Sequence, residues 1–385
     1  MFIFQVMPVF ILIFLVLLLV YSILIDYYRR SWNSIPETNA AATGVKVSLV
    51  VALRNEEHHL EGFIDAVTAL DYPEDELEII LVDDHSEDGT TQRLMGLSSK
   101  FTVLKLPGGL AGKKKAIERG IAESTGQLIV TTDADCTFSP GWIRAMAGCY
   151  LQTGARFIAA PVHMTHRKSF IGIFQSLDFL TLQGITGASV YKKFHTLCNG
   201  ANLAYEKRVF DEVDGFTGID HIPSGDDMLL MYKIFRRYPG DVHYLKNKEA
   251  VVSTPAESSA WKFFQQRIRW ASKAVHYDDK NVFYILLLVY LVNVGFAVLL
   301  TASIMNKFWL PFLLLFFLMK LLAEFPFLNA VAGFFGARKL MVFFPLMQPF
   351  HILYTVVAGW MGRFGSYRWK SRTIKNKGRT NPAKL

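Results

Sequence analysis

The chain has 385 residues, of which 51% are hydrophobic and 19% are charged, and its net charge is +8. Because the apolar residues gather in a few charge-free blocks, this composition excludes a purely soluble protein and a disordered, collagen-like or disulfide-stapled chain. Eight Lys and Arg residues and no acid lie from Arg363 to the end, so the rest of the chain is balanced in charge. A balanced body argues against nucleic-acid binding, whereas a basic tail beside an apolar block favours contact with anionic lipids. Three cysteines without CxxC spacing predict free thiols in a reducing compartment.

The first apolar block covers residues 1–25, carries no charge and is long enough to span a bilayer as a helix. A cleaved signal peptide is the alternative, but the block lacks a basic start and is followed by Arg29 and Arg30 instead of a small-residue cleavage site. We therefore expect an uncleaved anchor over residues 1–28, with its C-terminal end in the cytoplasm beside the two arginines.

A second membrane region is predicted over residues 281–362. Its first part, residues 281–306 and 308–319, is free of charge and predicts a helical hairpin with a short outer turn. Lys320 and Glu324 follow, and because they are four residues apart they share a helix face and are expected to pair.

The last apolar block, residues 340–362, is interrupted by two prolines, a glutamine and a histidine. A further full span would place the basic tail, residues 363–385, outside, although its charge favours the cytoplasm. We therefore expect this block to be re-entrant or interfacial, with a third C-terminal span as the alternative.

Between the membrane regions, a linker at 29–45 precedes a predicted domain at 46–280, in which buried apolar runs alternate with helical patterns. Strands are predicted at Val47–Val51, Ile79–Val82, Val103–Leu106 and Leu128–Thr132, and helices at 56–70 and Lys113–Ala122. Such alternation indicates an α/β domain with a mostly parallel sheet. Ligands bind parallel sheets at the carboxyl ends of the strands, and two acidic clusters follow such ends.

The first informative cluster is the triplet Asp133-Ala134-Asp135, directly after a predicted strand. Alternate residues leaving a strand can present both carboxylates to one side. Mg²⁺ and Mn²⁺ prefer oxygen ligands, and few protein carboxylates suffice when substrate phosphates complete the coordination shell. A solvated turn or a helix cap is the alternative.

Two further acidic pairs have both a functional and a structural interpretation. Asp83-Asp84 ends a strand and could accept a hydrogen bond from a base or ribose hydroxyl, or simply cap a turn. Asp226-Asp227 precedes the helical run Met228–Phe235. Asp227 could cap that helix or act as a general base toward an acceptor hydroxyl.

A last motif, Gln266-Arg267-Ile268-Arg269-Trp270, stands shortly before the second membrane region. Arginine can hold a diphosphate through two hydrogen bonds, and tryptophan offers a stacking face for a sugar. An amphipathic interfacial helix is the alternative, and it is compatible with the first interpretation.

In this order, the motifs resemble family 2 glycosyltransferases, in particular the membrane-bound branch of cellulose, hyaluronan and poly-N-acetylglucosamine synthases and ceramide glucosyltransferases. The resemblance covers about residues 47–270 and includes the Q(Q/R)xRW signature of that branch at every fixed position. It implies a GT-A fold and the use of a nucleotide-sugar, with uridine as the expected base.

The resemblance also implies roles for individual residues. Nucleotide contacts are expected from Ala52, Arg54, Glu56, Asp83, Asp84, Lys113 and Asp133. Metal ligation is expected from Asp133 and, more strongly, Asp135. Sugar or acceptor contacts are expected from Gly200, Ala201, Asn202, Asp226, Gln266, Arg267 and Trp270. Asp227 matches the catalytic base, Arg269 would stabilise the diphosphate, and Asp226 stands where the family usually has Glu.

These expectations describe an inverting glycosyltransferase of the inner (plasma) membrane, multi-pass, with a cytoplasmic catalytic domain. It would use Mg²⁺ or Mn²⁺ and transfer sugar to a glycolipid or a growing polysaccharide in contact with membrane lipids, with no nucleic-acid partner. Three alternatives have other signatures. An inactive glycosyltransferase-like scaffold would transfer nothing, and a membrane nucleotidyltransferase would release pyrophosphate. A transporter or channel would carry more intramembrane charge than Lys320 and Glu324.

Overall fold

The structure is a computed structural model that describes residues 2–165, 169–222, 225–272, 279–364, 366–369 and 372–375. The chain forms two compact units. We call residues 35–165 and 185–255 the sheet unit, and residues 1–34, 166–184 and 256–385 the helical unit. Most of the predicted basic tail, residues 363–385, lies outside the described residues. Its described part contains a two-stranded antiparallel pair, β10 (Ser366–Trp369) and β11 (Arg372–Lys375).

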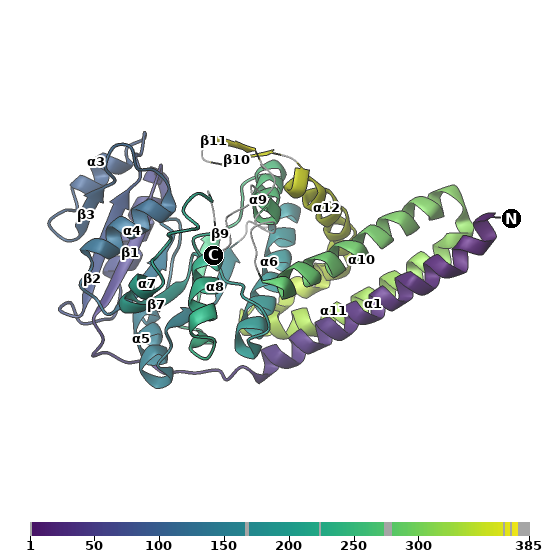
Figure 1. Cartoon of the computed structure of the whole chain (residues 1–385), viewed down its shortest axis with the longest axis horizontal. Coiled ribbons are helices and arrows are strands. Elements are labelled where there is room, and N and C mark those ends of the chain that lie inside the picture. Colours follow the sequence, from purple (N-terminus) through teal and green to yellow (C-terminus); the bar gives the residue numbers. More distant parts are fainter. Residues whose placement is uncertain are drawn as a thin grey trace. The chain divides into compact units, whose positions relative to one another are not determined.

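The sheet unit is built on seven strands in the order β3-β2-β1-β4-β7-β5-β8 (Figure 1). Their bounds are β1 Val47–Leu53, β2 Leu77–Asp83, β3 Thr102–Lys105, β4 Leu128–Thr132, β5 Phe157–Ala159, β7 Leu203–Glu206 and β8 Val242–Tyr244. The four strands from β3 to β4 are parallel, and β5 and β8 are parallel to each other, while β7 is antiparallel to both of its neighbours. This arrangement confirms the predicted mostly parallel α/β sheet.

The helices and the remaining strands of this unit complete the α/β fold. They are α2 Glu57–Thr68, α3 Thr90–Met95, α4 Lys113–Glu123, α5 Trp142–Thr153, α7 Lys207–Glu212 and α8 Met228–Arg237, with a small parallel pair β6 Val162–Thr165 and β9 Val252–Pro255. Helix α6, Phe170–Lys192, has residues in both units. All four strands and both helices predicted along the first half of the domain are present.

The central strands are hydrophobic because both faces of the sheet are covered. Every residue of β4 is buried, and Leu49, Val50 and Val51 of β1 are fully buried. The register pairs Leu53 with Asp83 across β1 and β2, and Val51 with Thr132 across β1 and β4. The loops that follow these three strands therefore leave the sheet at the same edge.

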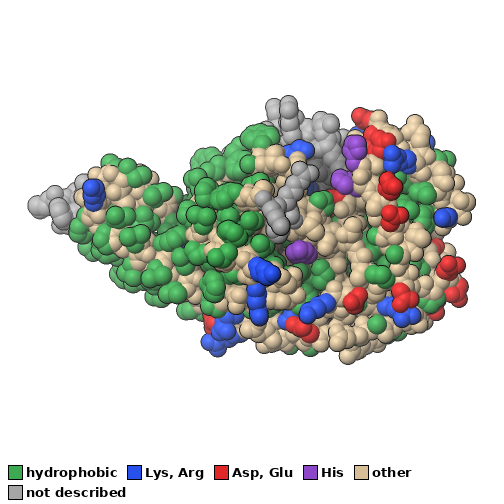
Figure 2. Space-filling view, turned by 180° about the vertical axis from the view of Figure 1, so that it is seen from behind, with side chains coloured by type: hydrophobic (Ala, Val, Ile, Leu, Met, Phe, Trp, Pro, Cys, Tyr) green, Lys and Arg blue, Asp and Glu red, His purple; other side chains and the backbone are tan. Residues whose placement is uncertain are grey.

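Within its described residues, the helical unit contains four helices that are long and apolar enough to cross a membrane: Pro8–Ser34, Lys280–Met305, Lys307–Phe334 and Arg338–Gly362. They correspond to α1 Phe2–Ser34, α10 Lys280–Met305, a 3₁₀ turn Lys307–Trp309 with α11 Leu310–Phe334, and a 3₁₀ turn Arg338–Phe343 with α12 Phe344–Phe364. Helices α1, α10 and α11 run side by side (Figure 1). Figure 2 shows mainly hydrophobic side chains on the surface of this unit, as contact with lipid requires.

The predicted hairpin forms, since α10 and α11 are joined through the short 3₁₀ turn. The predicted ion pair forms as well, with Lys320 Nζ 2.5 Å from Glu324 Oε1 and Lys320 fully buried. Helix α1 continues to Ser34, so the first residues of the predicted linker are helical. The three cysteines all fall within the described ranges, and each is buried with a free thiol.

The prolines interrupt the apolar sequence of the last block, but they do not interrupt its helix. Helix α12 is continuous through Pro349. Pro345 lies in its first turn, where a missing backbone N–H leaves no intrahelical hydrogen bond unmade. The block is long and apolar enough to cross a membrane, and a re-entrant or interfacial position stays a prediction.

Candidate active site

The two acids at the end of β2 have different surroundings. Asp83 accepts hydrogen bonds from the Ser86 backbone N–H at 3.2 Å and from the Thr91 hydroxyl at 2.8 Å, so it organises the turn after the strand. Asp84 is buried, and both its oxygens lie 3.0 Å from the backbone N of Gly112. The predicted turn role therefore applies to Asp83, and Asp84 joins the β2 end to the start of α4.

The loop after β1 approaches the same place because β1 and β2 end in register. The Arg54 guanidinium donates to the backbone carbonyl of Asp84 at 3.1 Å and to Glu87 Oε1 at 3.1 Å. Glu56 Oε2 lies 3.0 Å from Nδ1 of His59. Ala52 is half-buried near the end of the strand. A ligand at this edge would thus meet Arg54 beside Asp84.

Lys113 joins the acidic clusters to one another. Its Nζ lies 2.7 Å from Asp133 Oδ1 and 3.2 Å from Asp226 Oδ2. Burial lowers the pKa of Lys113, but Asp133 and Asp226 outweigh burial and hold that pKa well above its ordinary value. The ammonium group is therefore charged at neutral pH and stands between the DxD triplet and the acidic pair before α8.

Asp135 has a less favourable electrostatic environment. Burial, then the charges of Asp133 and Glu56, raises the pKa of its carboxyl to about 6. One oxygen of Asp133 already has Lys113 as a cationic partner. No group of three His, Cys, Asp or Glu side chains within the described ranges could hold a metal ion. The carboxylates fit a cation that takes few protein ligands and fills its shell with substrate oxygens, and Asp135 is the stronger ligand candidate.

Asp227 both caps a helix and lies in the cluster. It is the N-cap of α8, with Oδ1 accepting from the Met228 backbone N–H at 2.8 Å and Oδ2 accepting from the Gly200 backbone N–H at 3.2 Å. A carboxylate has about four acceptor positions, so an added hydroxyl donor can still be accommodated. A Cβ on Gly200 would lie 3.3 Å from Lys113 Nζ, so glycine there permits the close approach.

Asn202 is hydrogen-bonded inside the sheet unit. The residue is fully buried, and its amide donates to the carbonyls of Pro161 at 2.8 Å and Ala250 at 2.7 Å, while its Oδ1 accepts from Trp142 Nε1 at 3.0 Å. These bonds occupy both donors of the amide. Ala201 is buried, with its carbonyl accepting from the Thr132 hydroxyl at 2.7 Å. Of the three predicted residues, Gly200 is the one in contact with the charged cluster.

Two residues that sequence analysis did not select also shape this site. Gly112 has φ of 105°, a conformation that L side chains rarely adopt, and this conformation presents its N–H to Asp84. Lys114 is buried, and its Nζ donates to the carbonyls of Ile219 at 2.5 Å and Ile222 at 2.9 Å. It thereby ties the segment before Asp226 to α4. The lysine run at 113–115 was the available signal, because a buried lysine needs such partners.

The QxxRW motif lies on α9 (Ala260–Ser272), which belongs to the helical unit. Gln266 Nε2 donates to Glu257 Oε1 at 3.2 Å, and Gln266 Oε1 accepts from Arg267 at 2.6 Å. Arg267 is buried, and its guanidinium stacks over the Trp270 ring, 4.1 Å from the centroid. Arg269 and Trp270 are partly exposed on this helix, as substrate contacts require.

The sheet unit thus brings most of the predicted residues to one edge. Lys113 contacts Asp133 and Asp226, while Asp227 contacts Gly200. The helix that begins at Lys113 follows Gly112, which contacts Asp84. The roles predicted for Gln266, Arg267, Arg269 and Trp270 rest on a helix of the other unit, and they stay predictions.

Comparison with known proteins defines the class of this protein. Residues 48–213 match the family model described as "Glycosyl transferase family 2". The match includes the Asp133-Ala134-Asp135 triplet and Lys113, whereas the signature at Gln266–Trp270 lies beyond it. These residues therefore form a family 2 glycosyltransferase domain, and the mostly parallel seven-stranded sheet is GT-A-like.

Individual relatives agree with this assignment. The chain is 27% identical over 240 residues to "Probable glycosyltransferase YdaM" of Bacillus subtilis (strain 168), which covers 59% of this chain and 54% of that protein. It is 23% identical over 235 residues to "Poly-beta-1,6-N-acetyl-D-glucosamine synthase" of Staphylococcus epidermidis (strain ATCC 35984 / DSM 28319 / BCRC 17069 / CCUG 31568 / BM 3577 / RP62A), with 58% and 53% covered. The chain spans about half the length of these curated relatives.

A solved structure supports the fold over most of the chain. It is a mannosyltransferase, PcManGT from Pyrobaculum calidifontis, in complex with GDP-Man and Mn²⁺. The TM-score is 0.58 at 18% sequence identity, and the alignment covers 92% of this chain and 98% of that one. At this identity the likeness concerns the fold.

Proposed function

We propose that this protein is an inverting glycosyltransferase that moves a sugar from a nucleoside diphosphate sugar to a hydroxyl of a membrane-associated acceptor. The observation that carries the proposal is the cluster in which Lys113 bridges Asp133 and Asp226 at the carboxyl edge of a GT-A sheet. Parallel sheets bind ligands at this edge, and the cluster combines a fixed cation with carboxylates for a metal and a base.

The nucleotide is assigned to the ends of β1 and β2. Asp84 would accept hydrogen bonds from the base or ribose, with Ala52, Arg54, Glu56 and Asp83 forming the surrounding loops. The charged Lys113 favours the diphosphate electrostatically. A uridine donor follows from the family resemblance, whereas the solved mannosyltransferase of the same fold holds GDP-Man.

Asp135 and Asp133 are assigned as ligands of a divalent cation, Mg²⁺ or Mn²⁺. Two neighbouring carboxylates repel each other, and the raised pKa of Asp135 reflects that repulsion together with burial. A cation bound there would neutralise charge on the leaving diphosphate. Arg269 is proposed to support the same charge, and Gln266 and Trp270 are proposed to serve sugar and acceptor binding, with buried Arg267 stacked against Trp270.

Asp227 is assigned as the general base of a single displacement. The acceptor oxygen attacks the anomeric carbon, the bond from that carbon to the diphosphate oxygen breaks, and the hydroxyl proton passes to Asp227. The Gly200 and Met228 backbone N–H groups hold the carboxylate in place. One displacement inverts the anomeric centre, so an α-linked donor gives a β-linked product. Gly200 and Asp226 would line the sugar side, and the buried residues Ala201 and Asn202 would hold the segment that carries Gly200.

The acceptor is proposed to be a glycolipid or a growing polysaccharide, reached at the cytoplasmic face of the inner (plasma) membrane. Four helices that are long and apolar enough to cross a membrane support this location. Mass analysis of the product separates these outcomes, since one added sugar indicates a lipid acceptor and a ladder indicates a polymerase.

The donor is identified by a thermal-shift panel of UDP-sugars and GDP-mannose, each with and without Mn²⁺ or Mg²⁺, on the full-length protein. The best donor is then incubated with membrane lipids, and the released nucleotide is measured. Release of nucleoside diphosphate with a labelled lipid or polymer supports the proposal. Release of pyrophosphate indicates a nucleotidyltransferase, and binding without any transfer indicates an inactive scaffold.

Substitution Asp227→Asn tests the assigned base. It should lower turnover by roughly 10²–10⁴-fold, because general base removal costs that much, while nucleotide binding persists. The matched control is Asp241→Asn, which removes an acid that pairs with Arg156 at 2.9 Å in the same unit. Turnover of Asp227→Asn close to that of the wild type would contradict the assignment.

A further inference from the structure

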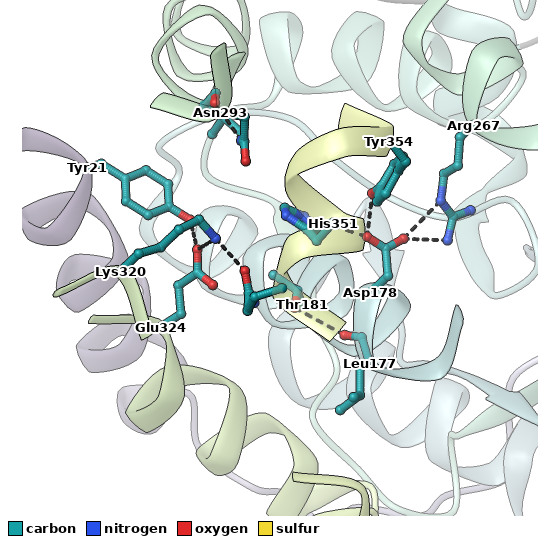
Figure 3. Close-up of polar contacts among 12 residues, drawn as sticks. Tyr21, Leu177, Asp178, Thr181, Arg267, Asn293, Lys320, Glu324, His351 and Tyr354 are labelled. Atoms are coloured by element: carbon teal, nitrogen blue, oxygen red, sulfur yellow. Dashed lines mark hydrogen bonds and ion pairs between the residues drawn. The ribbon is translucent and has the colours of Figure 1, made fainter. Parts of the chain in front are cut away.

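An acid in the interior of the helical unit is unexplained by the site described above. Asp178 lies on α6, in an apolar stretch, and its side chain is only 4% exposed. A buried carboxylate is costly unless it is paired and hydrogen-bonded. The residues that bind the Asp178 carboxylate therefore indicate its role. Figure 3 shows these residues around the carboxylate.

The main partner is Arg267 of the QxxRW motif. Its Nε and Nη2 donate to Asp178 Oδ2 at 2.9 and 2.6 Å, and the arginine side chain is also 4% exposed. Two bonds from one guanidinium fix both the position and the plane of that group. Arg267 is consequently engaged inside the unit, which leaves Arg269 as the arginine of the motif for a diphosphate.

The guanidinium of Arg267 contacts the tryptophan of the motif, Trp270. The guanidinium carbon lies 4.5 Å from the centroid of the Phe263 ring and 4.1 Å from that of Trp270. Cation–π contacts at these distances are favourable, more so when desolvated. Trp270 also has Phe179 as a ring neighbour, at 6.2 Å between centroids. The residue after Asp178 thus contacts the same tryptophan.

The other oxygen of Asp178 faces α12. Tyr354 donates its hydroxyl to Oδ1, and His351 Nε2 lies 3.8 Å from the same atom (Figure 3). Helix α9 also packs on α12 through buried Ile268 and Ala358. The carboxylate therefore joins three helices, namely α6, α9 and α12, at the helix that carries the motif.

A second buried pair in the same unit provides a natural comparison. Lys320 Nζ contacts Glu324 Oε1 at 2.5 Å and Gln348 Oε1 at 2.6 Å, and Tyr21 donates its hydroxyl to Glu324. This group joins α1, α11 and α12 and includes no residue of α9. It is similarly buried and charged, but it does not contact the motif.

We propose that Asp178 is a positioning residue that, through Arg267, sets the orientation of Trp270 for the acceptor end of the transfer. This inference rests on the proposed function and adds a residue to its machinery. Asp178 touches no substrate in this proposal. Its effect is transmitted by the two guanidinium bonds on one side and the ring stacking on the other.

Substitution Asp178→Asn tests this role on the full-length protein in vesicles of Escherichia coli polar lipids, with UDP-glucose, UDP-N-acetylglucosamine and GDP-mannose as donors. Misplacing a group by about 1 Å can cost roughly 10²-fold in rate, so kcat should fall to about that extent. The KM for the donor should stay within about twofold, since the residues assigned to the base, the ribose and the cation lie in the sheet unit. Asp178→Glu, which keeps the charge, should recover part of the rate.

A double substitution separates positioning from a purely structural role. If Asp178 acts through Trp270, adding Asp178→Asn to Trp270→Ala should change kcat by less than about twofold. The matched control, Glu324→Gln, removes a comparable buried charge that does not contact α9, and its kcat should stay near that of the wild type. Arg267→Lys replaces Asp178→Asn if the latter does not yield folded protein, with the same expectation.

Two results would overturn the inference alone, while the wild type transfers sugar. One is an Asp178→Asn rate equal to that of the wild type, and the other is a full multiplicative loss in the double variant. A wild-type protein that binds a donor but transfers nothing would instead contradict the proposed function and, with it, this inference.

Discussion

The two units treat charged side chains in opposite ways. In the sheet unit, the charges of the candidate site remain partly exposed, with side-chain exposures of 22% for Lys113, 41% for Asp133 and 16% for Asp226. In the helical unit, Lys320 and Arg267 are 0% and 4% exposed and are bonded to carboxylates of the same unit. A partly exposed charged side chain can interact with a ligand. A buried charged side chain is already paired with a neighbouring residue and connects the helices around it.

This difference indicates where to look for chemistry in this protein. The buried charges of the helical unit attract attention first because buried charges are rare, yet Lys320 and Arg267 both have protein partners in hydrogen-bonding geometry. The charged groups that are exposed enough to contact a substrate, such as Lys113 and Asp133, lie at the carboxyl edge of the sheet. The following predictions test this contrast, beginning with the largest expected effect.

Replacing a partly exposed carboxylate of the sheet unit should affect activity far more than stability. For Asp135→Asn, loss of cation-dependent stabilisation of the diphosphate should lower turnover by roughly 10²-fold or more. The thermal shift that a nucleotide-sugar produces with Mn²⁺ should vanish, while unfolding without ligand changes little. A metal-dependent shift equal to that of the wild type would remove Asp135 from the cation site.

Adding one methyl group inside the helical unit should affect stability instead. A Cβ on Gly184 of α6 would meet buried Val331 and would lie 2.7 Å from Cζ of buried Phe327, both on α11. Because neither neighbour has room to move, Gly184→Ala should cost about 1–3 kcal/mol, measured by thermal unfolding in detergent.

The matched control is Gly62→Ala on α2, where nothing lies within 4 Å of the added atom. Since alanine is the better helix former, this variant should gain up to about 1 kcal/mol in stability. If Gly184→Ala were neutral, the close approach of α6 and α11 would not contribute to the stability of the unit.

A smaller effect concerns acid sensitivity in the sheet unit. Burial raises the pKa of Glu78, but hydrogen bonds from Ser48, Thr125 and Gly126 outweigh it and leave that pKa below its ordinary value of 4.5. The folded state therefore binds the proton less tightly than the unfolded state. The stability that this charge adds is present above pH 4.5 and is lost as the pH falls through the folded-state pKa.

Substitution Glu78→Gln should remove about 1 kcal/mol at neutral pH and should flatten the loss of stability on acidification. Thermal unfolding between about pH 6 and pH 3 measures both effects. Glu61→Gln, on the exposed face of α2, serves as the control. An unchanged pH dependence in Glu78→Gln would contradict the assignment of acid sensitivity to this residue.

Much of the sheet unit was predictable because its strands are short, apolar and followed by acids. The runs at Val47 and Leu128 can be buried on both faces of a parallel sheet, and such burial determines which strands lie at its centre. The edge that carries Asp84 and Asp133 then follows from topology. The ion pair between Lys113 and Asp226 did not follow, because it joins residues 113 positions apart in the chain through the folding of the segments before α4 and α8.

The helical unit was less predictable in its interior. Hydrophobic length predicted the helices and their approximate ends, and the four-residue spacing predicted the pairing of Lys320 with Glu324. Asp178 was overlooked, although one acid in an apolar run was a signal. Nothing local indicates that its partner is Arg267, since the two residues are 89 positions apart in the chain.

The amino-acid order alone therefore determined the family resemblance, the alternation of strands and helices, and the set of residues from which a sugar-transfer site can be built. These features depend on local pattern and on residue chemistry. Only the tertiary structure decided which polar groups stay exposed and which are buried and hydrogen-bonded to other residues, as Asn202 and Arg267 are. The reason is that burial and partner choice arise from long-range packing, which no stretch of sequence encodes by itself.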